Sequence, residues 1–434
     1  MKFDPTIAIY GALMAVVWGI YVYRMRRVEE KSLAIKAAAV EAGMTEPASL
    51  HPSIDPARCL GCGICTKVCP EGDILGIIGG RAELVEPTHC IGHGACAAAC
   101  PTGAITLVFG TAKRGIDLPQ VGPDFQTNVS GIFIAGELGG MGLIRNAVTQ
   151  GRQAVDSVRK MGGLGVAGQL DLVIVGAGPA GLAGALAAKQ HGLRYVVIEQ
   201  DDLGGTVFKY PRGKIVMTSP AVLPIVGQVN FRETTKESLL AFWKDIETTH
   251  QLQVRYREQV LNITKDGKVF TVNTTAGTER CAAVLLAIGR RGTPRKLDVP
   301  GESQSKVVYQ LIDAEQYKGR HVLVVGGGDS ALEAAGTIAE QPGTTVTLSY
   351  RSEAFSRAKL KNRERVERMS KTGEMTVMLG SKVRGLTHDQ AEIEWQGKRH
   401  IIPNEAVVIC VGGILPTEFL KSTGIAMETK YGTV

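Results

Sequence analysis

Aromatic residues are scarce in this chain and make up 5% of its 434 residues. Their scarcity argues against a β-sandwich, whereas the 53 glycines suit the tight turns of nucleotide-binding folds. Blocks of basic residues are missing too, because lysine and arginine are scattered and the formal net charge is only +7. We therefore expect no nucleic acid among the partners of the protein. The length is typical of about three domains.

The sequence also lacks the even spread of cysteines that a disulfide framework shows. Seven of the nine cysteines lie between Cys59 and Cys100, while Cys281 and Cys410 stand alone in apolar runs. Tight clustering within a long chain favours metal binding over disulfides. We expect the two isolated cysteines to be buried core thiols.

The apolar run IAIYGALMAVVWGIYVY, residues 7–23, lies close to the N-terminus. Its 17 residues would extend about 25 Å as a helix, near the lower limit for crossing a bilayer core. Arginines at positions 24, 26 and 27 follow the run, so the positive-inside bias places the rest of the chain in the cytoplasm. The alternatives are a buried core helix and a cleavable signal peptide, which carries its positive charge before the run. We predict a single-pass membrane anchor over residues 1–27, with the N-terminus outside, and a linker helix over residues 28–52.

Two consecutive cysteine runs predict a small α+β ferredoxin domain with two clusters over residues 53–110. CLGCGICTKVCP, residues 59–70, and CIGHGACAAACP, residues 90–101, have the bacterial ferredoxin spacing. A zinc site would favour two separated CxxC pairs instead. In ferredoxin spacing, three cysteines of one run share a cluster with the last cysteine of the other. We assign one 4Fe–4S cluster to Cys59, Cys62, Cys65 and Cys100, and the other to Cys69, Cys90 and Cys96, with His93 as a candidate fourth ligand.

His93 stands where the second run departs from four cysteines, and it leaves two alternatives open. Imidazole can ligate iron, and it would raise the reduction potential of its cluster because it removes a negative charge. Alternatively, His93 stays unligated and the site holds a 3Fe–4S cluster or a cubane with an open iron.

A first dinucleotide motif begins in DLVIVGAGPAGLAGALAAKQHG, residues 171–192, where an apolar strand, a glycine turn and a helix follow one another. The next strand, YVVIEQ, ends at a glutamate that would accept hydrogen bonds from an adenosine ribose. The carboxylate favours FAD at this site. The residues assigned to FAD here are Gly176, Gly178, Pro179, Ala180, Gly181, Glu199 and Gly205.

A second motif repeats the design in HVLVVGGGDSALEAAGTIAEQPGTTVTLSYR, residues 321–351. Its second strand ends without an acid and meets an arginine, whose guanidinium can pair with a 2′-phosphate. This contrast favours NADPH at the second site, although the more distant arginine at position 357 also suits a solvated surface charge. The residues assigned to NADPH are Gly326, Gly328, Asp329, Ser330, Ala331, Arg351 and Arg357.

These motifs resemble the two-dinucleotide flavoproteins, most closely the thioredoxin-reductase-like group. The resemblance is carried by DLVIVGAGPAGLAG, IEQDDLGGTV, VLLAIGRRGTPRKLDVPGE, VLVVGGGDSALEAA, LSYRSEAFSRAK and VVICVGGILPTEFL. It implies an α/β fold with two three-layer, Rossmann-like domains, and it is compatible with a homodimer. The implied boundaries are 166–296 for the FAD domain, 297–406 for the NADPH domain and 407–434 for a return to the FAD domain.

The segment that closes the FAD pocket in that group stands in an unusual place here. TNVSGIFIAGELGGMGLIRNAVTQGRQAVDSV, residues 127–158, precedes the first glycine motif instead of ending the chain. The resemblance therefore implies a circular permutant whose closing segment spans residues 111–165. It also implies that Gly136 and Glu137 contact the ribityl chain of the flavin, although the family usually has Asp in place of Glu137.

Thioredoxin reductases relay electrons through a CxxC pair just before the second glycine motif, and residues 307–319 contain no cysteine. We therefore expect NADPH to reduce the flavin directly and the clusters to carry single electrons, with no side chain acting as an acid–base catalyst. The predicted function is electron transfer between NADPH, FAD, two clusters and an unidentified redox protein or membrane carrier, in either direction. A dithiol-free reductase of a small disulfide or another diffusible substrate, and a redox sensor or assembly subunit, remain alternatives.

Overall fold

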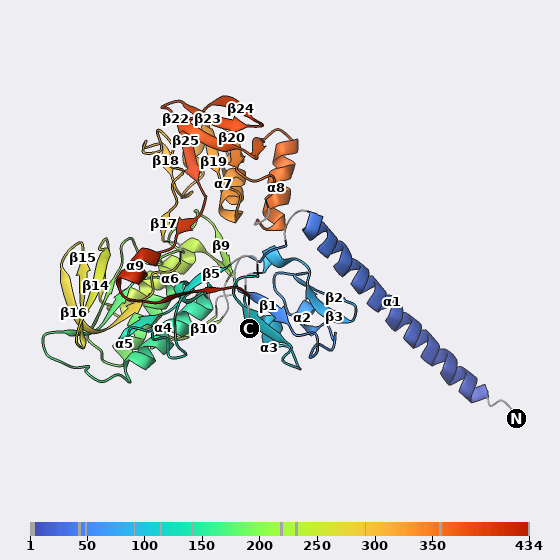
Figure 1. The fold of residues 1–434 in the computed structure, drawn as a ribbon, viewed down its shortest axis with the longest axis horizontal. Helices are drawn as coiled ribbons and strands as arrows, with labels where there is room; N and C mark the ends of the chain where they lie inside the picture. The colour runs from blue at the N-terminus through green and yellow to red at the C-terminus, as the bar shows by residue number, and fades with distance from the viewer. Residues whose placement is uncertain are drawn as a thin grey trace. The chain divides into compact units, whose positions relative to one another are not determined.

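The computed structural model describes residues 5–41, 45–47, 50–90, 92–112, 115–140, 142–217, 220–230, 233–290, 292–355 and 358–432. Figure 1 shows the fold of the chain. The described residues form two compact units. Unit 1 comprises Met1–Gly115 with the short segments Ser356–Lys359 and Tyr431–Val434. Unit 2 comprises Ile116–Phe355 and Leu360–Lys430.

Helix α1, Pro5–Glu41, is one continuous helix of 37 residues, so the predicted boundary at residue 27 falls inside it (Figure 1). Across the described part of the chain, no helix is both long and apolar enough to span a membrane. The predicted membrane anchor over residues 1–27, and the membrane localisation with it, is therefore wrong. The arginines at positions 24, 26 and 27 limit the uncharged run to 17 residues, at the lower end of the length that a spanning helix needs.

The second half of α1 packs against the cysteine-rich part of unit 1. Ser32 is buried there, and its hydroxyl oxygen accepts a hydrogen bond from the backbone N–H of Ile77 at 3.2 Å. Lys31 lies 2.7 Å from Asp73 in an exposed ion pair, and Glu29 accepts a hydrogen bond from the N–H of Gly79 at 2.7 Å. The segment predicted as a linker helix is therefore an integral part of unit 1.

The cysteine-rich part consists of two similar halves, as its repeated motif predicts. Each half contributes strands to antiparallel pairs and a one-turn helix that begins directly after a glycine. A small core of Cys65, Leu75, Ile77, Ala82, Cys96 and Ile105 lies between the halves. The elements are β1 (His51–Ile54) paired with β4 (Ile105–Val108), β2 (Leu75–Ile78) paired with β3 (Arg81–Leu84), α2 (Ile64–Lys67), η1 (Pro87–His89) and α3 (Ala95–Ala98).

The first lobe of unit 2 is built on a seven-stranded sheet in the order β13-β8-β7-β16-β15-β14, with β6 also paired to β16. Its parallel part is buried on both sides, as the long apolar runs of the sequence predict. The strands are β6 (Ile132–Ile134), β7 (Leu170–Val175), β8 (Tyr195–Ile198), β13 (Val254–Arg255), β14 (Val260–Asp266), β15 (Val269–Thr274) and β16 (Thr278–Leu286). The helices are η2 (Glu137–Gly139), α4 (Ile144–Val158), α5 (Pro179–Gln190), α6 (Lys236–Thr249) and α9 (Thr417–Ser422).

Residues 127–158 join this lobe although they precede its glycine motif in the chain. Strand β6 runs parallel to β16, with Ile132 opposite Val284. Helix α4 packs along α5 (Figure 1). The two helices approach so closely that a Cβ atom at Gly151 would lie 2.0 Å from the carbonyl oxygen of Ala180. Further pairs in unit 2 are β5 (Ile116–Pro119) with β27 (Met427–Lys430), β9 (Ile215–Met217) with β12 (Glu233–Thr235), and β10 (Ala221–Leu223) with β11 (Gly227–Val229).

The second lobe of unit 2 has a five-stranded parallel sheet in the order β18-β25-β19-β20-β21. Its strands are β18 (Val307–Val308), β19 (His321–Val325), β20 (Thr345–Tyr350), β21 (Met375–Leu379) and β25 (Ala406–Ile409), and its helices are η3 (Glu315–Tyr317), α7 (Asp329–Ala339) and α8 (Leu360–Lys371). A separate antiparallel sheet contains β22 (Lys382–Leu386), β23 (Gln390–Trp395) and β24 (Lys398–Pro403), and a short pair joins β17 (Thr293–Pro294) to β26 (Gly413–Ile414). Both lobes thus have the Rossmann-type sheet that the sequence predicts.

A buried carboxylate anchors the start of the first lobe's central strand. The side chain of Asp171 accepts hydrogen bonds from the Arg194 guanidinium at 2.8 and 3.1 Å and from the N–H groups of Gly165 and Arg194 at 2.6 and 2.9 Å. These bonds, led by those from the guanidinium, lower the pKa of Asp171 from 3.8 to about 2.

We expect Asp171→Asn to lower the free energy of unfolding by about 2 kcal/mol at pH 7. Because the pKa of the folded state is depressed, the stabilisation is present above pH 3.8 and is lost as the pH falls toward 2. Denaturant unfolding of the wild-type protein and of Asp171→Asn between pH 7 and about pH 2 measures the difference in the free energy of unfolding. A difference that stays constant down to the lowest pH would contradict the assignment.

Candidate nucleotide sites and cysteine cavities

The structure gathers the cysteines of unit 1 around two separate cavities. The first cavity is lined by Cys59, Cys62, Cys65 and Cys100, together with Pro101 and Thr102. Three of these thiols come from the first cysteine run, and the fourth comes from the end of the second run. This is the set that the sequence assigns to the first cluster.

The second cavity is lined by Cys69, Cys90 and Cys96, together with His93. Glu71, which the sequence analysis did not single out, lines this cavity as well. Across the described ranges, no three or more His, Cys, Asp or Glu side chains are arranged around a point suited to a single metal ion. The thiols instead surround the two cavities.

The thiols within the cavities interact electrostatically. Burial, followed by repulsion from Cys59, Cys62 and Cys96, raises the pKa of Cys65 to about 11. Burial and nearby charges likewise raise the pKa of Cys90 to about 11. Thiolates gathered in this way need a positive charge to offset their repulsion, and the iron of an iron–sulfur cluster supplies it.

Backbone N–H groups also approach the cysteine sulfur atoms. The N–H of Ala82 lies 3.4 Å from the sulfur of Cys59, and the N–H of Ala104 lies 3.3 Å from the sulfur of Cys100. Hydrogen bonds to sulfur are one of the factors that set cluster potentials. The donor set, its charge and these bonds therefore fit iron–sulfur clusters.

The first glycine motif forms the turn between β7 and α5. Gly176 has a φ of 102°, and a Cβ atom at Gly181 would lie 1.8 Å from the carbonyl oxygen of Gly176. Only glycine therefore allows this turn to close onto the helix. Gly178 is different, because the nearest atom to a Cβ there is the Cα of Gly205 at 3.9 Å. Helix α5 begins with Pro179 and Ala180, so its N-terminus comes directly after the open space at Gly178.

Glu199 follows β8 and lies beside this turn. The residue is 5% exposed, and its carboxylate accepts hydrogen bonds from the N–H of Ala177 at 2.7 Å and from the N–H of Asp201 at 2.9 Å. Burial raises the pKa of this carboxyl group, while the two backbone bonds act in the opposite direction. The glutamate therefore holds the glycine turn in place, and its remaining lone pairs can still accept ribose hydroxyls.

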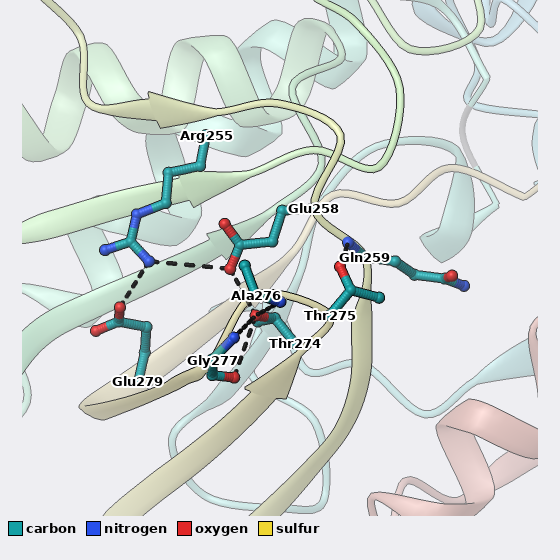
Figure 2. A network of polar contacts seen from close by, with 8 residues as sticks. All are labelled: Arg255, Glu258, Gln259, Thr274, Thr275, Ala276, Gly277 and Glu279. Carbon is teal, nitrogen blue, oxygen red and sulfur yellow. Dashed lines mark hydrogen bonds and ion pairs between the residues drawn. The ribbon is translucent and has the colours of Figure 1, made fainter.

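A polar network surrounds Glu258 (Figure 2), whose segment is hydrogen-bonded to the backbone of Glu199. The N–H of Glu199 donates to the carbonyl of Arg255 at 2.9 Å, and the N–H of Glu258 donates to the carbonyl of Glu199 at 3.1 Å. The buried carboxylate of Glu258 accepts a hydrogen bond from the Thr274 hydroxyl at 2.6 Å. Figure 2 also shows the Arg255 guanidinium directed at Glu279, 2.6 Å away. The network ties β13 to the β15–β16 hairpin, and Arg255 and Glu258 connect it to the backbone of Glu199.

The structure brings Gly136 to the first glycine motif. Gly136 lies between β6 and η2 with a φ of 86°, and a Cβ atom there would lie 3.2 Å from the Cβ of Ala180. Its N–H donates to the side-chain oxygen of Gln150 on α4 at 2.8 Å. Glu137 follows in η2. Both residues therefore lie beside the N-terminal turn of α5, while their contacts with the flavin stay predictions.

The second glycine motif has the same design in the second lobe. Gly326 forms the turn after β19, and a Cβ atom there would lie 2.3 Å from the carbonyl oxygen of Cys410. Gly328 has open space around its Cα, with nothing within 4 Å of a Cβ position. Asp329 and Ser330 begin α7, and Ala331 is fully buried against the turn. Gly328 therefore corresponds to Gly178 of the first motif, where the space around the glycine is also open.

The strand register places a tyrosine, not Arg351, at the position of Glu199. Val175 pairs with Ile198 in the first lobe, and the equivalent Val325 pairs with Ser349 in the second. The residue after Ser349 is Tyr350, and its ring lies 2.3 Å from a Cβ position at Gly327 and stacks on Phe355, with the ring centroids 5.6 Å apart. Aligning the two motifs by strand pairing would have found this tyrosine. Arg351 follows one residue later and is exposed.

Arg357 lies outside the described residues. Its assignment to NADPH therefore stays a prediction.

The two isolated cysteines differ from each other. Cys281 is fully buried in β16, and burial raises its pKa to about 12, as a core thiol requires. Cys410 is only partly buried, because it follows the end of β25 at the Gly326 turn. The prediction of two buried thiols is therefore confirmed for Cys281 and wrong for Cys410.

Two Rossmann-type lobes, each with a glycine turn at the end of its first strand, define the class of two-dinucleotide flavoproteins. The chain belongs to the pyridine nucleotide-disulphide oxidoreductase family, whose model matches residues 173–434. A 4Fe-4S dicluster domain model matches residues 51–101. The protein is an FAD-dependent NAD(P)H oxidoreductase with an iron–sulfur domain.

Known relatives agree with this assignment. A ferredoxin–NADP reductase of Ignicoccus hospitalis is 30% identical over 276 residues, which cover 60% of this chain and 83% of that protein. The bacilliredoxin reductase Bdr of Bacillus subtilis is 26% identical over 267 residues, which cover 60% of this chain and 82% of that protein. The structure of the bacillithiol disulfide reductase Bdr from Staphylococcus aureus matches with a TM-score of 0.53 and 26% identity, over 59% of this chain and 81% of that one.

Proposed function

We propose that the protein transfers electrons between NADPH, FAD and two 4Fe–4S clusters of its own chain, and then to or from a separate redox protein. The observation that carries the proposal is the presence, in one polypeptide, of two cysteine-lined cavities and two different dinucleotide turns. Bound flavin supplies the exchange between two-electron chemistry at nicotinamide and one-electron chemistry at iron–sulfur clusters.

The side chains have separate tasks in this proposal. Gly178 leaves the space in which the pyrophosphate of FAD meets the N-terminus of α5, and Glu199 accepts the ribose hydroxyls. Gly328 leaves the corresponding space for the pyrophosphate of NADPH. The guanidinium of Arg351 pairs with the 2′-phosphate of NADPH. Cys69, Cys90 and Cys96 hold the second cluster together with His93.

We propose further that residues 111–165 complete the FAD domain as a circularly permuted closing segment. The pairing of β6 with β16 and the close packing of α4 on α5 support this reading. In it, Gly136 and Glu137 contact the flavin ribityl chain. Permutation is physically tolerable because the termini of compact domains often lie close together at the surface.

The separate redox partner is proposed to be a small electron-carrier protein. The similarity to the ferredoxin–NADP reductase of Ignicoccus hospitalis supports this proposal, because the name of that enzyme specifies such a partner. Cluster potentials span roughly −700 to +450 mV, so the chemistry allows electrons to flow in either direction.

Anaerobic mixing of the purified protein with NADPH tests the proposal. We expect rapid bleaching of the flavin absorbance, followed by the appearance of reduced-cluster signals in electron paramagnetic resonance (EPR) spectra. Cys65→Ala and Cys96→Ala should each remove one set of signals and leave flavin bleaching at the wild-type rate. Fast flavin reduction with clusters that never change, or a protein without iron and acid-labile sulfide, would defeat the proposal.

A second candidate function is the reduction of a small disulfide at the flavin. The likeness to bacilliredoxin reductase and to bacillithiol disulfide reductase favours it. This function predicts NADPH-dependent turnover of a low-molecular-weight disulfide that persists in the Cys65→Ala and Cys96→Ala variants. Electron transfer through the clusters predicts that turnover with a protein acceptor is lost in at least one of them.

A further inference from the structure

The two cysteine cavities are related by the internal repeat of the sequence. Each residue of the first run lies 31 positions before its counterpart in the second, so Cys62 corresponds to His93. By the same offset, Glu71 corresponds to Thr102, and each directly follows a Cys-Pro pair. The structure preserves the correspondence, because Thr102 lines the first cavity and Glu71 lines the second.

The two differences between the cavities have opposite effects on charge. In the first cavity, four cysteines can contribute four negative charges, and Thr102 contributes only a neutral hydroxyl, 3.6 Å from the sulfur of Cys100. In the second, His93 replaces one thiolate and leaves three, while Glu71 adds a carboxylate. Both cavities therefore carry the same number of acidic side chains.

We propose that Glu71 compensates for the missing thiolate at His93 and keeps the reduction potential of the second cluster low. The inference rests on the proposed presence of a cluster in each cavity. Glu71 acts as a positioned charge and not as an iron ligand. A cluster gains one negative charge when it takes up one electron, so a nearby carboxylate disfavours reduction and a nearby imidazole favours it.

The field of Glu71 reaches the thiols of its own cavity. Its charge contributes to the raised pKa of Cys69, where burial is the largest cause. It contributes in the same direction at Cys90, after burial and the charges of Cys96 and Cys69. The backbone around the two positions is alike, since the N–H of Glu71 interacts with Cys69 as that of Thr102 does with Cys100.

Among the described residues of unit 1, Lys359 forms an ion pair with Glu71. The ammonium group of Lys359 lies 3.6 Å from its carboxylate, and the two side chains are 48% and 26% exposed. An ion pair this open to solvent is strongly screened and removes only part of the carboxylate's effect.

Redox titration of the full chain, followed by EPR, measures the two cluster potentials. Spectra of Cys65→Ala and Cys96→Ala assign each signal to its cavity. We expect Glu71→Gln to raise the potential of the second cluster alone, by about 59 mV, which is a tenfold change in a one-electron equilibrium. Glu71→Asp should keep the potential near its wild-type value, and Lys359→Gln should lower it by less than Glu71→Gln raises it.

Two further variants test compensation itself. Thr102→Glu should lower the potential of the first cluster and leave the second unchanged. His93→Cys should lower the second potential, and the double variant His93→Cys with Glu71→Gln should return it to near the wild-type value.

Several outcomes would overturn the inference. Unchanged potentials in an iron-replete Glu71→Gln protein, or equal shifts of both clusters, would exclude charge compensation. Loss of iron from the second site in Glu71→Gln would make Glu71 a ligand and overturn the inference as well. A wild-type protein without iron would instead defeat the proposed function, so the two failures can be told apart.

Discussion

Gly178→Ala should lower the affinity for FAD by about 100-fold, or about 3 kcal/mol, and leave the fold intact. The backbone at Gly178 has φ −75° and ψ −175°, which alanine adopts without strain. A Cβ atom there would meet no protein atom closer than 3.9 Å, so the apoprotein should tolerate it. The same methyl group would occupy the space through which the pyrophosphate approaches the start of α5. Flavin content after purification and titration of the apoprotein with FAD measure the effect.

Two matched glycines act as controls for this prediction. At Gly181 the added Cβ would lie 1.8 Å from a backbone oxygen, so Gly181→Ala should lower the thermal stability of the apoprotein as well as FAD binding. Gly328→Ala should leave the protein yellow with FAD and remove its reduction by NADPH. A Gly178→Ala protein that retains a full complement of FAD would contradict the placement of the pyrophosphate.

Arg351→Glu should lower the affinity for NADPH by about 100-fold and change that for NADH little. A charge-assisted hydrogen bond contributes about 1.5–3 kcal/mol, and the new carboxylate would add repulsion of the 2′-phosphate. Arg351 is exposed in the structure and follows directly after β20, so its side chain is free of core packing. The expected loss is therefore one of binding and not of folding. Calorimetric titration with NADP⁺ and NAD⁺, alongside flavin-reduction rates, gives the preference directly.

Two neighbouring substitutions separate charge from shape. Arg351→Gln removes the positive charge without adding a negative one and should cause roughly half of the loss in binding energy. Tyr350→Phe keeps the ring that covers Gly327 and should leave coenzyme preference unchanged. A coenzyme preference that stays at the wild-type ratio in Arg351→Glu would remove the case for a 2′-phosphate site at this strand end.

Local patterns were sufficient for much of the molecule. The glycine turns, the strands that precede them and the helices that follow lie where the sequence predicts, because each depends on residues next to one another in the chain. The division of cysteines between two cavities was also predictable, since ferredoxin spacing itself determines which thiol reaches which cluster.

Other features depend on contacts that the linear pattern does not contain. The apolar run near the N-terminus suggested a membrane anchor, yet α1 continues through Arg24 to Glu41 and packs Ser32 against Ile77. The strand register shows that Tyr350, and not Arg351, occupies the position that Glu199 has in the first lobe. This register is defined by the partner of each residue on the neighbouring strand. The bracing of Glu199 through Glu258 and Thr274 joins residues 75 positions apart, so no local signal reveals it.

The sequence by itself determined the class of the protein, its two glycine turns and the division of its thiols between two cavities, because these features reside in short motifs whose chemistry requires particular residues at particular spacings. Only the tertiary structure decided which side chains face the same cavity or lie opposite each other across a sheet. Glu71 lines the same cavity as three thiols and His93, and the ring of Tyr350 covers Gly327. Such neighbours are selected by packing between distant segments, and the charge and shape that they bring to a site follow from that packing.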